Sequence, residues 1–138
     1  MKIVEKIRIQ ATPEQIFHFY EDVSRWSSWD PDVQSSSIDG DFITGAKGRL
    51  KPAKGPDAKI EFTEITKNQS FTTISKLPLC TMRFVHELLP SGEATEVVHK
   101  VVFSGLLSPL FGRLIGTGIR KGLPATMQGL RNAVESKS

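Results

Sequence analysis

The spacing of hydrophobic residues changes along this chain between the period of a β-strand and that of an α-helix. From residue 33 to residue 104, apolar positions recur about every second residue, in short segments that end at glycine, proline, asparagine or aspartate. A period of two places alternate side chains on the same face of a strand. Together with the N-terminal segment, the pattern predicts strands at residues 2–10, 33–38, 46–51, 59–66, 70–77, 81–89 and 95–104.

Two short helices are predicted between the first and second of these strands. The sequence Thr-Pro-Glu-Gln, which starts at Thr12, is a capping box in which Thr12 and Gln15 each bond to the backbone of the other. A second helix is expected to begin near Asp22 and to end before Pro31. The two tryptophans that precede this proline are expected to pack as a corner of the core.

The longest helical pattern extends from Ser108 to Glu135, where apolar residues recur every three or four positions. We expect Ser108 to cap the start of this helix. Pro124 lacks a backbone N–H, so it predicts a bend near Arg120. The order of strand, two helices, six strands and long helix indicates an α+β fold, in which one antiparallel sheet curls around the last helix.

This helix is unusually rich in glycine. Gly116, Gly118, Gly122 and Gly129 each cost about 1 kcal/mol relative to alanine inside a helix. At about 100° per residue, three of them fall with Ala125 in one narrow sector of the helix. Two interpretations remain open. The bare face leaves a cavity above the sheet for a small molecule, or the small residues let another segment pack closely.

Composition is typical of a soluble globular protein. At 138 residues, the chain has the length of a single domain, residues 1–138, and 38% of its residues are hydrophobic. The N-terminal segment lacks the apolar run of a signal peptide, and the single Cys80 excludes an internal disulfide. We therefore expect a cytoplasmic protein. Basic residues interrupt the last helix, so no membrane-spanning segment is expected.

The net charge of +3 is most concentrated between residues 47 and 59. The basic residues of this stretch are Lys47, Arg49, Lys51, Lys54 and Lys59. Nucleic-acid binding would need a denser cluster with aromatic rings beside it, and this stretch contains no aromatic residue. We interpret it as a solvated sheet edge and expect no nucleic-acid partner.

Two histidines are the best candidates for chemistry. His86 and His99 lie in the sixth and seventh predicted strands, each on a face that is otherwise apolar. If the turn at residues 90–92 joins these strands, pairing of the two faces places the rings opposite or diagonally adjacent. The rings then bind a ligand or act as a general base, or they are simply buried and bonded to neighbouring groups. Without a third ligand they do not make a zinc site, so we expect no metal.

Four local patterns occur in the order found in one superfamily. They are ATPEQIF from residue 11, DVSRWSSWDP from residue 22, the hairpin from His86 to His99, and FSGLLSPLFGRLIGTGIRKGLPATMQGL from residue 103. With them, the whole chain resembles the START-like superfamily, also called Bet v 1-like, SRPBCC or the polyketide cyclase/lipid transport group. The resemblance implies a helix-grip fold, in which a seven-stranded antiparallel sheet grips the C-terminal helix around an elongated apolar cavity. It implies no single function.

Three functions remain open. The first is the binding or carriage of an apolar or amphipathic small molecule, such as a lipid, an isoprenoid or an aromatic polyketide-like compound, without a cofactor. The second, suggested by the resemblance, is an enzyme of the polyketide cyclase, aromatase or dehydratase type with His86 or His99 as its base. The third is a protein-interaction module with an incidental cavity. The residues expected to line a cavity are Phe62, Ile74, Met82, Phe84, His86, His99, Val101, Phe103, Leu114, Gly118 and Gly122.

Overall fold

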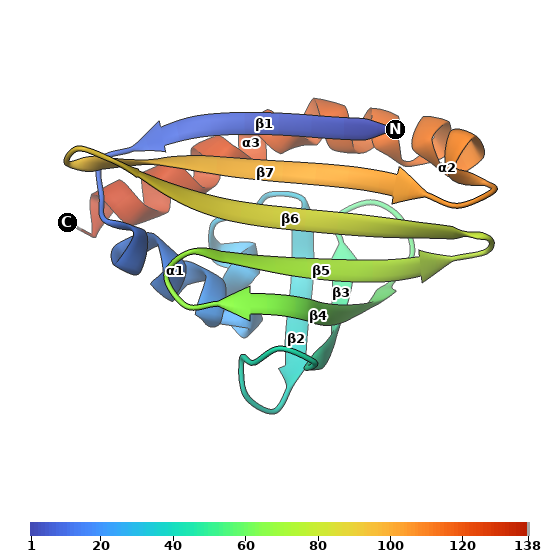
Figure 1. Ribbon diagram of the computed structural model, residues 1–138, viewed down its shortest axis with the longest axis horizontal. Helices are drawn as coiled ribbons and strands as arrows, with labels where there is room; N and C mark the ends of the chain where they lie inside the picture. Colours follow the sequence, from blue (N-terminus) through green and yellow to red (C-terminus); the bar gives the residue numbers. More distant parts are fainter. Residues whose placement is uncertain (138) are drawn as a thin grey trace.

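The computed structural model describes residues 1–137, and its elements follow the predicted order (Figure 1). The strands are β1 (Lys2–Ile9), β2 (Val33–Asp39), β3 (Lys47–Pro52), β4 (Ala58–Thr66), β5 (Ser70–Leu77), β6 (Cys80–Ser91) and β7 (Ala94–Ser104). The helices are α1 (Pro13–Glu21), the 3-10 helix η1 (Val23–Ser28), α2 (Ser108–Leu114) and α3 (Gly116–Ser136).

All seven strands belong to one sheet in the order β1-β7-β6-β5-β4-β3-β2, and every neighbouring pair is antiparallel. The predicted α+β fold, with a seven-stranded sheet and two short helices between the first two strands, is confirmed. β6 is longer than expected, because Pro90 lies within it and the turn consists of Gly92 and Glu93. Gly92 has a φ of +66°, a conformation that glycine adopts without strain.

The helices lie on one side of the curved sheet. Figure 1 shows α3 running obliquely behind β1 and β7, and its contacts with the sheet are mainly with β1. The buried apolar side chains form two clusters. The larger cluster joins α1, η1, the middle strands and the second half of α3. The smaller cluster lies at the α2 end, and its buried members are Ile3, Cys80, Val101, Phe103 and Leu123.

The capping box at the start of α1 is present as predicted. The N–H of Gln15 donates to the Thr12 hydroxyl at 3.2 Å, and the N–H of Thr12 donates to the Gln15 side-chain oxygen at 2.9 Å. The tryptophan corner is also as expected, since Trp26 and Trp29 are both buried. The indole N–H of Trp26 donates a 3.0 Å hydrogen bond to the carbonyl of Tyr20, which ties η1 to the end of α1.

The C-terminal helical segment is divided into two helices, which the sequence pattern did not predict. Arg120, where we expect a bend, and Pro124 both lie inside α3, which runs from Gly116 to Ser136 without an interruption. Arg120 and Pro124 are both exposed, so water can replace the hydrogen bond that the proline cannot make. The interruption lies at Ile115, between α2 and α3.

The predicted Ser108 cap at the start of the C-terminal helical segment is wrong. Ser108 is the first residue of α2, and no side chain caps that helix. Instead, the Ser108 N–H donates to the carbonyl of Gly105 at 3.1 Å. Gly105 has a φ of +108°, and a Cβ there would lie 2.7 Å from the Leu79 carbonyl oxygen. A glycine-dependent turn therefore positions α2.

Two of the glycines in α3 allow the corner between η1 and β2 to pack closely on the helix. A Cβ at Gly122 would overlap the Asp32 carboxylate, and one at Gly129 would overlap the Trp29 carbonyl oxygen. Of the two interpretations that the sequence left open, close packing explains both positions. Gly118 differs, because it is exposed and its Cβ position has no atom within 4 Å.

Hydrogen bonds hold the same corner to α3. The Thr126 hydroxyl donates to Asp30 Oδ1 at 2.8 Å, and the N–H of Asp32 donates to the same oxygen at 2.9 Å. Burial raises the pKa of Asp30, against the lowering effect of these two hydrogen bonds.

Two further predictions concern the basic residues and the helices. The five basic residues between 47 and 59 are all exposed, as expected of a solvated face. Among the helices of residues 1–137, none has both the length and the apolar character that crossing a bilayer requires.

Candidate functional site

His86 on β6 and His99 on β7 stand directly opposite each other across the antiparallel pair. Their ring centroids are 4.5 Å apart and their planes are at 76°. Both side chains are buried, with 8% of His86 and 1% of His99 exposed. The strand pattern predicted rings that are either opposite or diagonally adjacent, and the register of the hairpin gives the opposite arrangement.

His86 is held as a neutral ring with one nitrogen available. Its Nδ1 lies 3.1 Å from the carbonyl oxygen of Phe71, and because a carbonyl only accepts, Nδ1 carries the proton. The ring is stacked on those of Phe71 and Phe84, with centroid distances of 3.8 and 4.5 Å. Nε2 is left with a lone pair and makes no hydrogen bond to any residue between 1 and 137.

His99 is bonded to the first helix. Its Nε2 lies 2.8 Å from the hydroxyl oxygen of Tyr20, a fully buried residue of α1. Its Nδ1 is sealed from solvent and has no hydrogen-bond partner among the described residues. A buried polar atom without a hydrogen-bond partner lowers the stability of the fold, and Nδ1 of His99 is such an atom.

Burial keeps the rings of Tyr20, His86 and His99 uncharged. Burial lowers the pKa of His99 to about 3. Burial and the neighbouring His99 lower the pKa of His86 well below 6.5, although its hydrogen bond to Phe71 acts in the opposite direction. Burial raises the pKa of the Tyr20 hydroxyl above its ordinary value of 10.0. At neutral pH the cluster therefore offers hydrogen-bonding groups and no charge.

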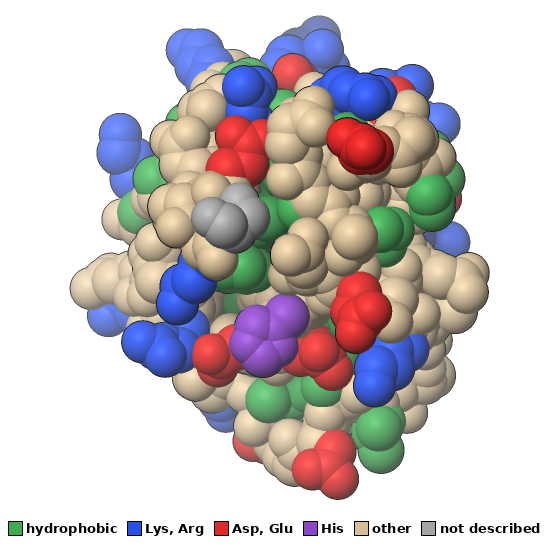
Figure 2. Space-filling view, turned by 90° about the vertical axis from the view of Figure 1, so that its left-hand side faces the viewer, with side chains coloured by type: hydrophobic (Ala, Val, Ile, Leu, Met, Phe, Trp, Pro, Cys, Tyr) green, Lys and Arg blue, Asp and Glu red, His purple; other side chains and the backbone are tan. Residues whose placement is uncertain are grey.

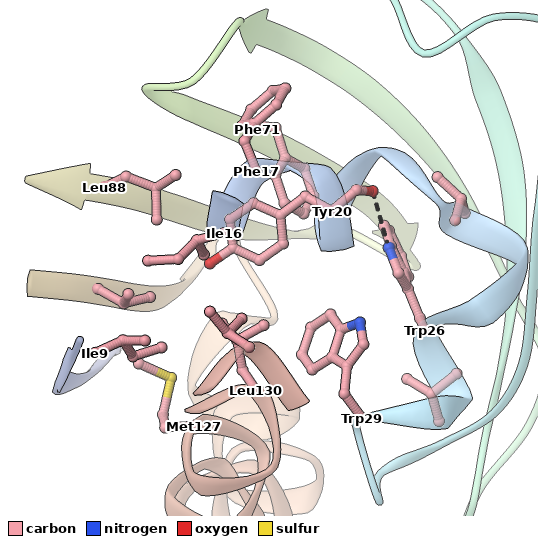
Figure 3. Close-up of a cluster of buried hydrophobic side chains, with 14 of the residues drawn as sticks. Ile9, Ile16, Phe17, Tyr20, Trp26, Trp29, Phe71, Leu88, Met127 and Leu130 are labelled. Carbon is pink, nitrogen blue, oxygen red and sulfur yellow. Dashed lines mark hydrogen bonds between the residues drawn. The ribbon is translucent and has the colours of Figure 1, made fainter. Parts of the chain in front are cut away.

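At the α1 end, side chains fill the space between the sheet and α3. Figure 3 shows the Tyr20 ring in the middle of this cluster, with Phe71 on the side of the sheet and Trp29 and Leu130 on the side of α3. The Tyr20 and Phe71 rings have centroids 4.8 Å apart in an edge-to-face arrangement. This end of the interior is a packed core.

At the α2 end, the same interior is partly exposed to solvent. Apolar side chains that surround the smaller cluster are only half-buried, and they come from β5, β6, the β7–α2 connection, α2 and α3. They are Leu77, Met82, Phe84, Leu107, Phe111, Ile115 and Ile119. Because α3 packs mainly against β1, it leaves the inner faces of β5 and β6 less covered at this end.

Two hydroxyls that the sequence analysis missed lie beside these apolar groups. Thr73 pairs with Phe84, and Ser75 pairs with Met82, so all four share the inner face of the sheet. Neither hydroxyl makes a hydrogen bond within residues 1–137. In the described part of the chain, the unpaired side-chain atoms that are sealed from solvent are Trp29 Nε1 and His99 Nδ1. The hydroxyls of Thr73 and Ser75, like Nε2 of His86, therefore border space that can hold a water molecule.

Most of the residues expected to line a cavity lie on this inner face. They are Phe62, Met82, Phe84, His86, His99, Val101 and Phe103. Phe62, Val101 and Phe103 are fully buried, whereas Met82 and Phe84 are half-buried and lie in the partly exposed region at the α2 end.

The expected placement of the other four residues is wrong. Ile74 pairs with Arg83 and therefore faces the outer side of the sheet. Leu114 is 69% exposed, and Gly118 is also exposed, because α2 and α3 turn these positions away from the strands. Gly122 faces the corner at Asp32 instead of the sheet.

Two open hollows mark the surface, and neither is lined by the expected residues. One, of about 440 Å³, lies between the β5–β6 turn and the β7–α2 connection. The other, of about 300 Å³, lies over β2 and β3. Among residues 1–137, no three side chains of histidine, cysteine, aspartate or glutamate are placed to hold a metal ion.

A curved antiparallel sheet that encloses a C-terminal helix, with a polar cluster on its inner face, defines a helix-grip protein. Solved structures share this fold over almost the whole chain. Protein MLL2253 from Mesorhizobium loti has a TM-score of 0.80 at 17% identity, covering 100% of this chain and 99% of that one. A START superfamily protein from Mycobacterium smegmatis has a TM-score of 0.76 at 16% identity, covering 99% of both chains.

A plant enzyme has the same fold. Norcoclaurine synthase from Thalictrum flavum, in complex with dopamine and hydroxybenzaldehyde, has a TM-score of 0.76 at 14% identity, covering 100% of this chain and 88% of that one. The sequence model described as "Polyketide cyclase / dehydrase and lipid transport" matches residues 1–135. The chain therefore belongs to the polyketide cyclase/dehydrase and lipid transport family, within the START-like superfamily. No curated protein sequence matches it.

Proposed function

We propose that this protein binds and carries an amphipathic small molecule on the inner face of its sheet, beneath α2 and the first half of α3. The observation that carries the proposal is the combination of half-buried apolar side chains with polar groups that lack partners. Met82 and Phe84 supply apolar surface, and the hydroxyls of Thr73 and Ser75 lie directly beside them. Pockets that bind small molecules combine these two features.

The polar groups define the chemistry of the ligand. The hydroxyls of Thr73 and Ser75 can donate and accept, while Nε2 of His86 accepts. Because burial lowers the pKa values of His86 and His99, the region has no imidazolium to pair with an ionised ligand at neutral pH. A molecule with an apolar body and a neutral hydroxyl or carbonyl end fits these groups. Isoprenoids and aromatic polyketide-like compounds with such an end have this chemistry.

The comparisons are consistent with this class of ligand. The description of the family names lipid transport beside polyketide cyclisation and dehydration. The norcoclaurine synthase structure holds dopamine and hydroxybenzaldehyde, which are small aromatic compounds with hydroxyl groups. These molecules are ligands of that enzyme, and for this chain they support only a small aromatic body as the apolar part of the ligand.

Carriage is favoured over catalysis by the state of the histidines. A general base acts best when its pKa lies near the working pH. Burial lowers the pKa of His99 to about 3, and Tyr20 occupies the Nε2 atom that would take a proton. A polyketide cyclase or dehydratase that used His86 or His99 as its base would need a stronger base than either ring provides.

Native mass spectrometry of the protein purified from its own host tests the proposal. We expect a retained compound that denaturation releases, with a mostly apolar structure and an oxygen-bearing end. A ligand-free protein, in material that binds no apolar probe afterwards, would contradict carriage and favour the protein-interaction module instead.

A further inference from the structure

Four leucines are strongly exposed at one end of the molecule. The exposed fractions are 65% for Leu79, 79% for Leu106, 49% for Leu110 and 69% for Leu114. Leu79 lies in the β5–β6 turn, Leu106 in the β7–α2 connection, and the other two on α2. Figure 1 shows these three segments together at the right-hand end of the sheet. Large apolar side chains grouped on a surface in this way mark an interaction site.

The two loops of this end are bonded to each other. The Leu107 N–H donates to the carbonyl of Leu79 at 2.9 Å. The hollow of about 440 Å³ lies between them, and Lys76, Leu79 and Leu106 are among the residues that line it. The exposed leucines of the turn and of the connection therefore form one surface. We call Leu79, Leu106, Leu110 and Leu114 the leucine end.

Leu79 occupies a position that the fold does not favour for leucine. Its φ of +52° lies in the left-handed region, where glycine or asparagine is preferred and a large side chain is strained. Because 65% of the side chain is exposed, packing does not offset this strain. Backbone strain of this kind is typical of functional positions, so the exposed leucine calls for a partner outside the chain.

Two exposed cations border the leucine end. No aspartate or glutamate occurs in residues 65–86 or 97–134. These two ranges form β5, most of β6 and β7, α2 and nearly all of α3. Lys76 borders the hollow, and Arg113 lies on α2 beside Leu110 and Leu114; both cations are exposed. The opposite end of the molecule, which faces the viewer in Figure 2, has acidic side chains among its basic ones.

We propose that the leucine end docks on an anionic lipid surface, with the leucine side chains in the headgroup–acyl boundary and Lys76 and Arg113 against lipid phosphates. Apolar side chains beside cations are the combination that peripheral proteins use at such surfaces. A second copy of the chain fits less well, because a twofold contact places identical patches together and would bring like charges face to face.

The docked surface adjoins the region proposed for the ligand. Leu77 at the end of β5, Leu107 in the β7–α2 connection and Phe111 on α2 are neighbours of the exposed leucines along the chain, but they are partly buried and pack against the smaller cluster. This link between docking and ligand exchange rests on the proposed function. The docking itself does not, because an empty protein presents the same leucines and the same cations.

Flotation with vesicles, using protein freed of ligand, tests the docking. We expect binding to vesicles of phosphatidylcholine and phosphatidylglycerol in equal parts, weakened by salt, and little binding to phosphatidylcholine alone. The double change Leu110→Ser with Leu114→Ser should weaken binding more than about tenfold. Lys76→Gln or Arg113→Gln should each weaken it about fivefold. The matched controls are Leu89→Ser, at an exposed leucine of the other end, and Lys51→Gln.

Leu79→Gly separates docking from a structural role. Glycine relieves the strain at this φ, so the melting temperature should stay the same or rise while vesicle binding falls. Sedimentation of the wild type should show a monomer without vesicles. Absence of binding to the anionic vesicles would overturn the proposal, and so would binding that Leu110→Ser with Leu114→Ser leaves unchanged. A dimer that the same double change dissociates, without vesicle binding, would assign the leucine end to a second copy.

Discussion

Tyr20 of α1 and His99 of β7 are joined by a 2.8 Å hydrogen bond in the interior of the molecule. Both residues are almost completely buried, and Nδ1 of the same imidazole has no partner among the described residues. The bond links α1 to β7, the strand that carries His99. Tyr20 belongs to the packed cluster at the α1 end of the interior, and the ligand region that we propose lies at the α2 end.

The first prediction concerns this bond. Tyr20→Phe removes the hydroxyl and leaves Nε2 of His99 buried without a partner, which should lower the free energy of unfolding by about 1–3 kcal/mol. Urea denaturation measures the change. Adding His99→Leu to Tyr20→Phe removes both polar partners, so the double variant should recover part of the loss. A Tyr20→Phe protein as stable as the wild type would show that the bond contributes nothing.

The histidine pair should make stability depend on pH. Burial lowers the pKa values of both rings in the folded protein, so the unfolded chain binds more protons as the pH falls below about 6.5. The free energy of unfolding should therefore decrease as the pH falls from about 6.5 towards 5. The raised pKa of Asp30 acts in the opposite direction, because as the pH falls the folded protein protonates this carboxyl before the unfolded chain does.

Urea denaturation across this pH window measures the effect. The double change His86→Gln with His99→Gln should flatten the curve, whereas His18→Gln, at an exposed histidine of α1, serves as the matched control. NMR titration of the wild type should give pKa values below 6.5 for both buried rings. Values at or above 6.5 would mean that the pair is solvated, against its burial here.

Two glycines of α3 should respond to alanine with opposite signs. Gly118→Ala should raise the free energy of unfolding by up to about 1 kcal/mol, because alanine favours the helix and its methyl group meets no neighbour. Gly129→Ala should lower it, because the methyl group overlaps the backbone carbonyl oxygen of Trp29, which cannot move aside as a side chain can. Thermal unfolding of the two variants distinguishes these outcomes. Equal effects at both positions would contradict the close packing of the η1–β2 corner on the helix.

The fold could be predicted from the sequence because periodicity is a local signal. A period of two in residues 33–104 located the strands. Pairing the apolar faces that hold His86 and His99 predicted rings within reach of each other, but it left the opposite and the diagonal pairing open. The site was predicted less completely. In β5 we selected Ile74 for its apolar side chain, yet alternation from Phe71 already placed Thr73 and Ser75 on the inner face.

Other features depend on contacts between distant parts of the chain. Nothing near Tyr20 in sequence indicates that its hydroxyl reaches His99, because 79 residues separate the two. The glycine sector of α3 was visible as a pattern, but the segment that packs on it, around Trp29 and Asp32, was not. Packing partners of this kind become known only when the structure places both segments.

The binding of a neutral apolar probe to the inner face tests the central claim most directly. A fluorescence titration with N-phenyl-1-naphthylamine compares the wild type with Ser75→Phe, which fills the proposed region, and with Ile74→Phe, which adds the same ring to the outer face of the same strand. Binding should be retained by Ile74→Phe and lost by Ser75→Phe, with both proteins folded by circular dichroism. Equal affinity in Ser75→Phe and the wild type, or no binding by the wild type, would contradict a ligand site beneath α2.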